Sequence, residues 1–569
     1  MEDNNRTVAE GVKKISLYTK IWTKWEKWIL FSSLILFSWA LNWEGNLTLV
    51  MSNYITDDLK SSSLLSLLST ISYILQTVLF PTYSKVSDMT GRKNVYIIGI
   101  VFYLVALAVM ATAKNYDTYL GGQVIYAFGY TACFIMGPIM IGDLTDVVNR
   151  GLFQGLYNLP SLINIFVSTV VADSLGTARW RLGMWINFAL VGGGILPLIT
   201  ILWVLQRRVQ QSQLYQDYKQ DQALNQPPKP TYTFMGRLKW IMEEFDIIGC
   251  LLLVGGLCMV LLPLVLATSR WGGWQSATTI GTLVGGVVSW ILFALYEWKL
   301  SKHPIFPWTK WPNRTPIFGI LVLSTVTLIS STNWLYFPKY LMLSRKIQYG
   351  EAVLLDRGYN VGYVVLQVVA GYLMKRTRKW RPFVWIGIAL MILGIGLMIP
   401  ARLPGSSNAF VVISQTIAGA GSGMLDIPIL VAIQSSVPHE DLAIVTALMQ
   451  VGGSICASIG STVAGAIWNS LLPIQLAQHV PGEYDPVAIL ASTDYAIGLP
   501  EEQYHGVVEA YGQVQRILSI TAVSFAALAF FFSLPMKSFG LEDRKDEDKN
   551  EVQTNEYDEK TEHSNDLKL

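Results

Sequence analysis

Fourteen apolar segments constrain this chain more than any other feature of its sequence. Each is 19 to 26 residues long, and a helix of about 20 apolar residues crosses the hydrocarbon core of a bilayer. Inside that core a chain must satisfy its backbone hydrogen bonds internally, which helices achieve. We therefore predict an all-α polytopic membrane protein with 14 transmembrane helices. The predicted spans are 28–50, 64–83, 95–113, 119–141, 155–175, 184–205, 247–267, 279–298, 317–337, 355–374, 383–401, 409–432, 443–468 and 517–536.

The amino-acid composition agrees with a membrane location. Hydrophobic residues make up 52% of the chain and charged residues 14%, against about 25% charged residues in soluble domains. The net charge of +2 gives no reason to expect nucleic acid as a partner. The four cysteines lie in apolar segments and the five histidines are scattered through hydrophilic ones, so neither set predicts a metal site. We expect no cofactor, and no nucleophile–base set indicates an enzyme.

The distribution of lysine and arginine predicts that both termini lie in the cytosol. An even number of spans places the two termini on one side, and cytosolic loops are enriched in cations. Six lysines or arginines precede the first span, six occur in 206–246 and five in 375–382. The opposite loops 51–63 and 402–408 carry one each.

The hydrophilic stretch from Ser84 to Lys93 joins the second and third spans in a tight turn. It holds one carboxylate, Asp88, and three cations, and Gly91 tolerates the backbone angles that a turn requires. The order Asp88, Gly91, Arg92, Lys93 resembles the loop between helices two and three of the major facilitator superfamily. Ser84 stands where that family usually has glycine, and it is also a small residue.

This resemblance implies the major facilitator fold, with two six-helix bundles and, here, two extra central helices. The second basic loop, 375–381, then takes the place in the second bundle that 84–93 has in the first, as expected for internal repeats that alternate in access. The predicted organisation is a cytosolic N-terminal segment 1–27, an N-terminal six-helix bundle 28–205, a cytosolic linker 206–246, two extra transmembrane helices 247–298, a C-terminal six-helix bundle 299–536 with a non-cytosolic loop 469–516, and a disordered cytosolic tail 537–569.

Six stretches along the chain resemble the fungal siderophore-iron transporter family. The most extensive runs from Gln434 to Ala443 and continues at Gly465-Ala466-Ile467-Trp468-Asn469. The others are Ser61–Thr70, Ile141–Leu152, Phe245–Gly249, Tyr296–Lys299 and Tyr511–Arg516. Glutathione exchangers share the same pattern. The resemblance implies a transporter of ferric siderophore chelates and leaves glutathione as an alternative substrate.

Two carboxylates within predicted spans are candidates for proton coupling or substrate contact. Glu44 lies in the first span, where the family commonly has aspartate, and Asp426 lies in the twelfth, just before Pro428. A charged group in a bilayer is costly unless it is protonated, paired or facing water. The alternative for Glu44 is a side chain that reaches the outer interface, and for Asp426 a hydrogen bond to a neighbouring helix. We predict Glu44 as the proton carrier and Asp426 as the second choice.

Residues at the cytosolic ends of spans two to four are predicted to form a conformational gate. Asp88 and Arg92 have the i,i+4 spacing that favours an ion pair on a helix, and the resemblance implies that they control conformation and do not contact substrate. An equally open alternative for the end of span four is a solvated helix end in which Asp146 and Arg150 pair. The residues of the predicted gate are Asp88, Gly91, Arg92, Asp143 and Arg150.

Aromatic residues supply two further predictions. Aromatics on inner spans suit a cavity for a bulky, weakly polar solute, although core packing is the alternative for each of them. The long loop 469–516 is predicted to be a lid over the outer mouth. The cavity candidates are Tyr126, Tyr130, Trp334 and Tyr336, and the lid candidates are Tyr504 and Tyr511.

The function expected from these observations is proton-coupled uptake of a ferric siderophore by a monomer. No Walker motif is present, so an ion gradient is the expected energy source. The plasma membrane is the expected location, with an endosomal or vacuolar membrane as the alternative. The competing function is a proton-coupled exporter or exchanger of glutathione or drugs. Drug antiporters carry a Gly-Pro-rich motif in span five, whereas residues 156–175 of this chain contain one proline, Pro160, and no such motif. A non-transporting sensor of the chelate is the third.

Overall fold

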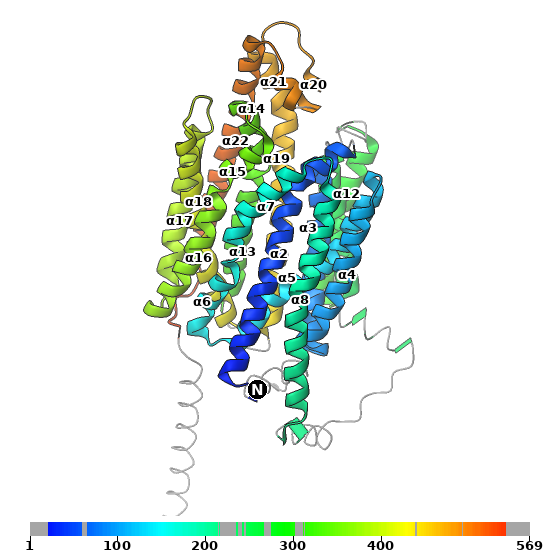
Figure 1. Ribbon diagram of the computed structural model, residues 1–569, viewed down its shortest axis with the longest axis vertical. Coiled ribbons are helices and arrows are strands. Elements are labelled where there is room, and N and C mark those ends of the chain that lie inside the picture. The colour runs from blue at the N-terminus through cyan, green and yellow to red at the C-terminus, as the bar shows by residue number, and fades with distance from the viewer. Residues whose placement is uncertain are drawn as a thin grey trace, which may run out of the picture.

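The computed structural model of the chain consists of long helices that run side by side (Figure 1). It describes residues 21–59, 65–213, 215–216, 235–236, 240, 242–243, 246–266, 273, 275–301, 311, 313–438, 441–491 and 493–541. Much of the predicted segment 1–27, linker 206–246 and tail 537–569 therefore lies outside the described residues. We call the end at which α2 (Lys24–Asp58) begins the lower end, and the opposite end the upper end, as they are drawn in Figure 1.

The helices fall into two halves and a middle pair. The first half continues from α2 with α3 (Leu65–Thr90), α4 (Arg92–Thr112), α5 (Tyr116–Leu144), α6 (Val147–Asn158), α7 (Ser161–Leu175) and α8 (Trp180–Gln210). The middle pair is α11 (Ile247–Leu266) and α12 (Ala277–Lys299). The second half contains α13 (Thr315–Trp334), α14 (Phe337–Arg345), α15 (Tyr349–Asp356), α16 (Gly358–Thr377), α17 (Arg381–Ala401), α18 (Asn408–Ser435), α19 (Leu442–His479), α20 (Pro486–Ala491), α21 (Thr493–Ile497) and α22 (Glu501–Ser533).

Ten helical segments of the described chain are long and apolar enough to cross a membrane. The helices α2, α3 and α16 occupy three other predicted spans, and α11 is apolar over Ile247–Pro263. The predicted class, an all-α protein with many membrane spans, is confirmed. The count of fourteen stays a prediction.

Short sequence signals determine where several helices begin. The side chains of Asn115, Ser276 and Ser407 accept hydrogen bonds from the backbone N–H three residues ahead and so cap α5, α12 and α18. Gly91 joins α3 to α4 with a φ of 92°, a backbone conformation that side chains disfavour. The predicted role of this glycine in the turn therefore has a direct structural reason.

The fifth predicted span is broken into two helices. We predicted one helix over 155–175, but α6 begins eight residues earlier, at Val147, and ends at Asn158. Pro160 lacks a backbone N–H and precedes the first residue of α7. The break divides this span into a lower helix and an upper helix, each of which contacts the second half of the molecule.

Each half has a core built mostly from its own residues, and several pairs of helices join the halves. Phe37, Tyr96 and Trp180 belong to the core of the first half, and Val384, Met391 and Leu425 to that of the second. Across the interface, α3 packs on α19, while α6 and α7 pack on α16. A solute that passes between the halves must therefore cross contacts made by these helices.

The middle pair packs on the outside of the α3–α19 contact. Helix α11 touches α12, α3 and α19. Its Leu253, Leu257 and Leu261 form a buried cluster with Ile74 of α3, and Ile455 of α19 packs against the cluster. The helix thus bridges the two halves on one side.

Apolar side chains cover outward-facing surfaces of the helices. On α12 the exposed residues Ile280, Val284, Val287, Ile291 and Leu295 recur every three or four positions and so form one stripe. An apolar face of this extent on a soluble monomer is rare, whereas lipid tails accept it. The protein is a multi-pass membrane protein.

The upper end of the second half is helical where we predicted a loop over 469–516. Helix α19 continues to His479 and α22 starts at Glu501, so only the intervening 21 residues, 480–500, connect them. Apolar residues at helical spacing explain the difference, since Leu472 and Leu476 on α19 are buried. At 38 residues and about 1.5 Å per residue, α19 is far longer than a bilayer core requires. Helices α20 and α21 lie at this upper end (Figure 1).

Candidate functional site

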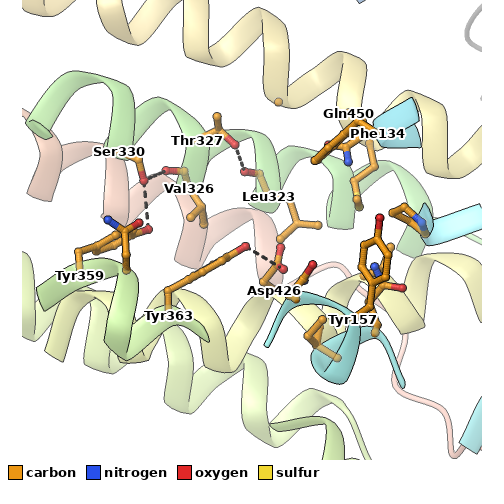
Figure 2. A pocket seen from close by; sticks show the side chains of 18 residues that line it. Phe134, Tyr157, Leu323, Val326, Thr327, Ser330, Tyr359, Tyr363, Asp426 and Gln450 are labelled. Atoms are coloured by element: carbon orange, nitrogen blue, oxygen red, sulfur yellow. Dashed lines mark hydrogen bonds between the residues drawn. The ribbon is translucent and has the colours of Figure 1, made fainter. Parts of the chain in front are cut away.

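A cavity of about 340 Å³ lies between the two halves. Small-molecule sites occupy about 300–1,000 Å³, so the cavity is near the lower end of that range. Its walls come from α5 and α6 of the first half and from α13, α16, α18 and α19 of the second. The lining residues are Phe134, Pro138, Gln154, Tyr157, Asn158, Leu323, Val326, Thr327, Ser330, Tyr359, Asn360, Tyr363, Asp426, Ile427, Leu430, Met449, Gln450 and Gly453. Figure 2 shows these side chains from close by.

Asp426 is the only carboxylate among these lining residues. Its Oδ2 accepts hydrogen bonds from the hydroxyl of Tyr363, at 3.1 Å, and from Nε2 of Gln367, at 2.7 Å. The bond from Tyr363 is drawn in Figure 2. The side chain is partly exposed, and the cavity is the space that it faces. The predicted alternative, a hydrogen bond to a neighbouring helix, is present together with a position on the cavity wall.

Glycines on α18 bring the donors of α16 within reach of Asp426. A Cβ atom at Gly419 would lie 1.9 Å from the carbonyl oxygen of Tyr359, and one at Gly423 would lie 2.1 Å from that of Tyr363. On the opposite face of α18, a Cβ at Gly421 would lie 2.2 Å from the backbone nitrogen of Met391 on α17. Only glycine permits such close backbone contact. The alternate glycines thus fix α16 and α17 on two sides of the helix that carries Asp426.

The halves are in close contact below the cavity. A Cβ at Gly371 of α16 would lie 2.5 Å from the carbonyl oxygen of Gly151 on α6, and one at Gly155 would lie 3.0 Å from Cα of Val368. Nδ2 of Asn158 donates to Oε1 of Gln367 at 3.2 Å. Gln367 therefore links the α6–α16 contact to Asp426.

The halves also touch above the cavity. The hydroxyl of Tyr54 donates to Asp173 of α7 at 2.8 Å, and the Tyr54 ring meets that of Tyr349 edge-on at 5.9 Å. The Asp173 carboxylate lies against Gly350, at the start of α15, where a Cβ atom would come within 2.4–2.8 Å of it. A carboxylate is favoured beside a helix N-terminus. This set of contacts joins α2 and α7 to α15.

Glu44 lies inside the first half and not on the wall of this cavity. It is completely buried. Its Oε2 accepts hydrogen bonds from the hydroxyls of Tyr103, at 2.6 Å, and Tyr126, at 2.8 Å, while Oε1 accepts one from Thr48 at 2.7 Å. The predicted alternative, a side chain that reaches the outer interface, is contradicted by this burial.

The predicted gate residues gather at the lower end. Arg92 forms an ion pair with Asp88 at 2.5 Å and another with Asp143 of α5 at 3.0 Å, and it also donates to the hydroxyl of Ser87. Arg150 is buried and donates to the carbonyl oxygen of Gly142 at 2.9 Å. The sequence spacing indicated the first of these ion pairs, whereas the link from Arg92 to Asp143 depends on how α4 and α5 pack.

None of the four aromatic residues predicted for the cavity wall lines this cavity. Tyr126 contacts Glu44, and Tyr130 stacks between Tyr126 and Phe134. Trp334 lies behind Tyr359, with ring centroids 4.4 Å apart. Tyr336 stacks on Trp468 at the same distance. Core packing, the alternative reading, describes these positions better because each ring packs against another ring.

Sequence reasoning missed the aromatics and amides that do line the cavity. Tyr359 and Tyr363 stack along α16 with centroids 6.1 Å apart, and Asn360 lies between them in sequence. Gln154 and Gln450 face the cavity from α6 and α19. Gly358 and Gly362 precede Tyr359 and Tyr363, and small residues at four-residue spacing mark a close helix contact. This glycine spacing could have indicated from the sequence that α16 packs closely on another helix.

The predicted lid tyrosines are buried in the upper end. The hydroxyl of Tyr504 donates to the carbonyl oxygen of Leu343 in α14 at 2.7 Å, and that of Tyr511 to the carbonyl oxygen of Ile489 in α20 at 3.4 Å. Both rings belong to a cluster that also contains Phe337 of α14. Tyr504 ties α14 to α22, and Tyr511 ties α20 of the connection to α22. Their position corrects the prediction of a loop.

No group of three or more His, Cys, Asp or Glu side chains that could hold a metal ion occurs among the residues that the structure describes.

Comparisons with known proteins agree with this architecture. A model of the Major Facilitator Superfamily matches residues 29–343 and 317–477. The human organic anion transporter MFSD10 has a TM-score of 0.54 and 10% identity, with coverage of 89% of this chain and 99% of that one. A bacterial homologue of the iron transporter ferroportin has a TM-score of 0.52 and 12% identity, with the same two coverages. These two likenesses concern the fold alone.

Similar sequences extend over nearly the whole chain. The siderophore iron transporter mirC of Emericella nidulans is 26% identical over 550 residues, which cover 94% of this chain and 88% of that protein. The MFS siderochrome iron transporter B of Aspergillus fumigatus is 27% identical over 540 residues, covering 93% and 85%. Siderophore iron transporter 1 of Saccharomyces cerevisiae is 26% identical over 544 residues, covering 91% and 83%. The chain belongs to the major facilitator superfamily, and these full-length relatives within it are named as fungal siderophore-iron transporters.

Proposed function

We propose that this protein takes up ferric siderophore chelates by secondary active transport coupled to protons. The observation that carries the proposal is the end-to-end similarity, at 26–27% identity, to proteins named siderophore iron transporters. The similarity extends over 91–94% of this chain. We further propose that the protein acts as a monomer in the plasma membrane with both termini in the cytosol.

The chemistry of the cavity supports a polar organic substrate. Three tyrosines and four amide side chains line it, together with Thr327 and Ser330. Amides and hydroxyls donate and accept hydrogen bonds, and tyrosine rings offer apolar faces. Hydroxamate chelates present carbonyl oxygens and aliphatic arms, which such walls accommodate. The iron remains bound to its chelator in this scheme.

Alternating access is proposed to occur by breaking one of two sets of contacts between the halves. Below the cavity these are the glycine contacts of α6 with α16 and the bond between Asn158 and Gln367. Above it, the contacts join Tyr54 and Asp173 to the start of α15. Opening the upper set admits the chelate from outside, and opening the lower set releases it.

The proton is proposed to reside on Glu44. Its partners are hydroxyl groups, which can donate to a carboxylate or accept from a carboxylic acid, so both protonation states find hydrogen bonds there. Tyr126, Tyr130 and Phe134 form a continuous stack on α5 from Glu44 to the cavity. This stack supplies a physical connection between protonation of Glu44 and the cavity wall.

The decisive experiment is uptake of a panel of radioactive iron chelates by fungal cells that lack their own siderophore transporters. We expect saturable accumulation of at least one chelate, abolished by a protonophore and absent from vector-only cells. Free radioactive iron salts serve as the matched substrate control. Failure to take up any chelate, combined with export of glutathione or drugs, would replace this proposal by the competing one.

A further inference from the structure

The carboxylate of Asp426 has one oxygen engaged and one oxygen available. Both of its hydrogen bonds end on Oδ2, from Tyr363 and Gln367. Oδ1 accepts no hydrogen bond from any residue that the structure describes. Because the side chain lines the cavity and is partly exposed, Oδ1 is the atom free to meet a ligand.

Among the residues that the structure describes, no positive charge is found next to Asp426. Its two donors, a phenol and an amide, are neutral, and none of the eighteen residues that line the cavity is lysine, arginine or histidine. Among the described ion pairs, none includes Asp426. A carboxylate withdrawn from water is stabilised by pairing with a cation. The cavity lacks that cation, and a substrate can bring it.

The aromatic side chains near Asp426 suit an alkylammonium group. Tyr363 bonds directly to the carboxylate, and Tyr359 stacks on Tyr363 with ring planes only 12° apart. The faces of aromatic rings attract ammonium groups. Ser330 of α13, which shares a hydrogen bond with Tyr359 at 3.1 Å, also lines the cavity and is an additional acceptor. A carboxylate oxygen, ring faces and a hydroxyl oxygen together match the needs of an –NH3⁺ group on an aliphatic arm.

We propose that Asp426 makes the transporter selective for siderophore chelates that carry a protonated amine, through an ion pair with Oδ1. This inference rests on the proposed function, since it specifies which members of the siderophore class bind best. Gln367 and Tyr363 act as positioning residues, because they hold Oδ2 and thereby point Oδ1 at the cavity. The rest of the chelate contacts the amides and hydroxyls of the lining.

The test compares two chelates that share one iron centre. Ferrioxamine B ends in a primary ammonium group, and its N-acetyl derivative is neutral at the same position. Initial uptake of both, labelled with radioactive iron, is measured in cells that express the wild-type chain. We expect the half-saturating concentration of the ammonium form to be about tenfold lower, a modest effect for a close charge pair. Equal affinity for the two forms would overturn the inference and leave the proposed function intact.

Substitutions at Asp426 test whether this residue causes the preference for the ammonium form. Asp426→Asn should reduce the ratio of half-saturating concentrations for the two chelates to about one. Asp426→Glu should retain part of the preference because it keeps the charge. Ser289→Ala, far from the cavity on α12, is the matched control and should keep the wild-type ratio. Retention of the full preference by Asp426→Asn at normal surface expression would overturn the assignment.

A competition assay on the wild-type protein covers the case in which Asp426→Asn does not reach the membrane. Uptake of the labelled neutral chelate is inhibited with unlabelled gallium complexes of the two forms. The ammonium complex should inhibit at an approximately tenfold lower concentration, and equal inhibition would overturn the inference. If the wild-type chain takes up neither chelate nor any other siderophore, the proposed function fails and the inference fails with it.

Discussion

The hydroxyl of Tyr103 lies 2.6 Å from a carboxylate oxygen of Glu44, which joins α4 to α2 inside the core of the first half. Glu44 is completely buried, and its partners in the described part of the chain are hydroxyl groups and include no cation. A buried acid that is surrounded by hydroxyls is held in place in either protonation state. Glu44 can therefore bind and release a proton without losing its hydrogen-bond partners.

Glu44→Gln should uncouple transport from protons. The amide imitates the protonated acid in size and hydrogen bonding but cannot release a proton. We expect the variant to exchange chelate across the membrane while losing accumulation against a gradient and the dependence on external pH. Uptake with and without a protonophore measures this, with Thr112→Ala as a control on an exposed helix end. Wild-type accumulation that a protonophore still abolishes would move the proton site elsewhere.

Arg92→Ala should slow transport while chelate binding remains. Arg92 lies between Asp88 and Asp143, and its removal leaves two carboxylates without their shared cation. Breaking a buried ion pair in this way costs about 3–5 kcal/mol. This cost destabilises the conformation in which the ion pair is formed. Asp88→Asn should have a smaller effect in the same direction. The measurement is a comparison of equilibrium chelate binding with initial uptake rate.

Lys93→Ala is the control for this loop because it removes the adjacent cation, for which no ion pair is seen. We expect Lys93→Ala to transport at close to the wild-type rate. Equal loss of binding and transport in Arg92→Ala, at normal surface expression, would argue against a purely conformational role.

Gly371→Ala should hinder closure of the lower end. The added methyl group would lie 2.5 Å from the carbonyl oxygen of Gly151, so α6 and α16 must separate. Overpacking of this kind costs about 1–3 kcal/mol. We expect a lower transport rate and faster labelling of a cysteine placed at Thr327, which lines the cavity, by a membrane-permeant thiol reagent. Gly396→Ala is the matched control, because open space surrounds that position, and the same change there should leave transport unaffected.

Tyr504→Ala and Tyr511→Ala should raise the half-saturating chelate concentration more than they lower the maximal rate. Both rings fill the core of the upper end, and Tyr504 also holds α14 through its hydroxyl. Their loss loosens the helices around the proposed outer mouth. Tyr504→Phe, which keeps the ring and removes the hydroxyl, should show a much weaker effect. A fall in maximal rate alone would assign these residues to stability and not to capture.

Hydropathy and the two resemblances predicted most of the architecture, because the bilayer requires long apolar helices. The break at Pro160 and the extension of α19 and α22 were missed. The break follows from the missing N–H of Pro160, whereas α19 and α22 are helical beyond their apolar runs because tertiary contacts stabilise them there. Packing at the upper end, which buries Tyr504 and Tyr511, is not encoded in local hydropathy.

The candidate site was predictable only in part. Asp426 was found because its glycines and Pro428 mark an irregular helix, but its donors Tyr363 and Gln367 depend on the register between α16 and α18. The same limit applies to Arg402, which we assigned to the loop 402–408 as its single cation. It is buried and donates to Asn333 at 2.8 Å and to Gln515 at 3.0 Å. A contact between helices that are distant in sequence can be predicted only when the fold is known.

The position of α11 affects how solutes reach the cavity. This helix covers the α3–α19 contact with leucines that also touch Ile74 and Ile455. It therefore separates the α3–α19 contact from the surrounding lipid tails on that side. A molecule dissolved in the membrane therefore meets the apolar helix α11 on that side before it reaches the contact between α3 and α19. This arrangement favours a path along the long axis of the protein, and a solute that arrives in water can enter by that path.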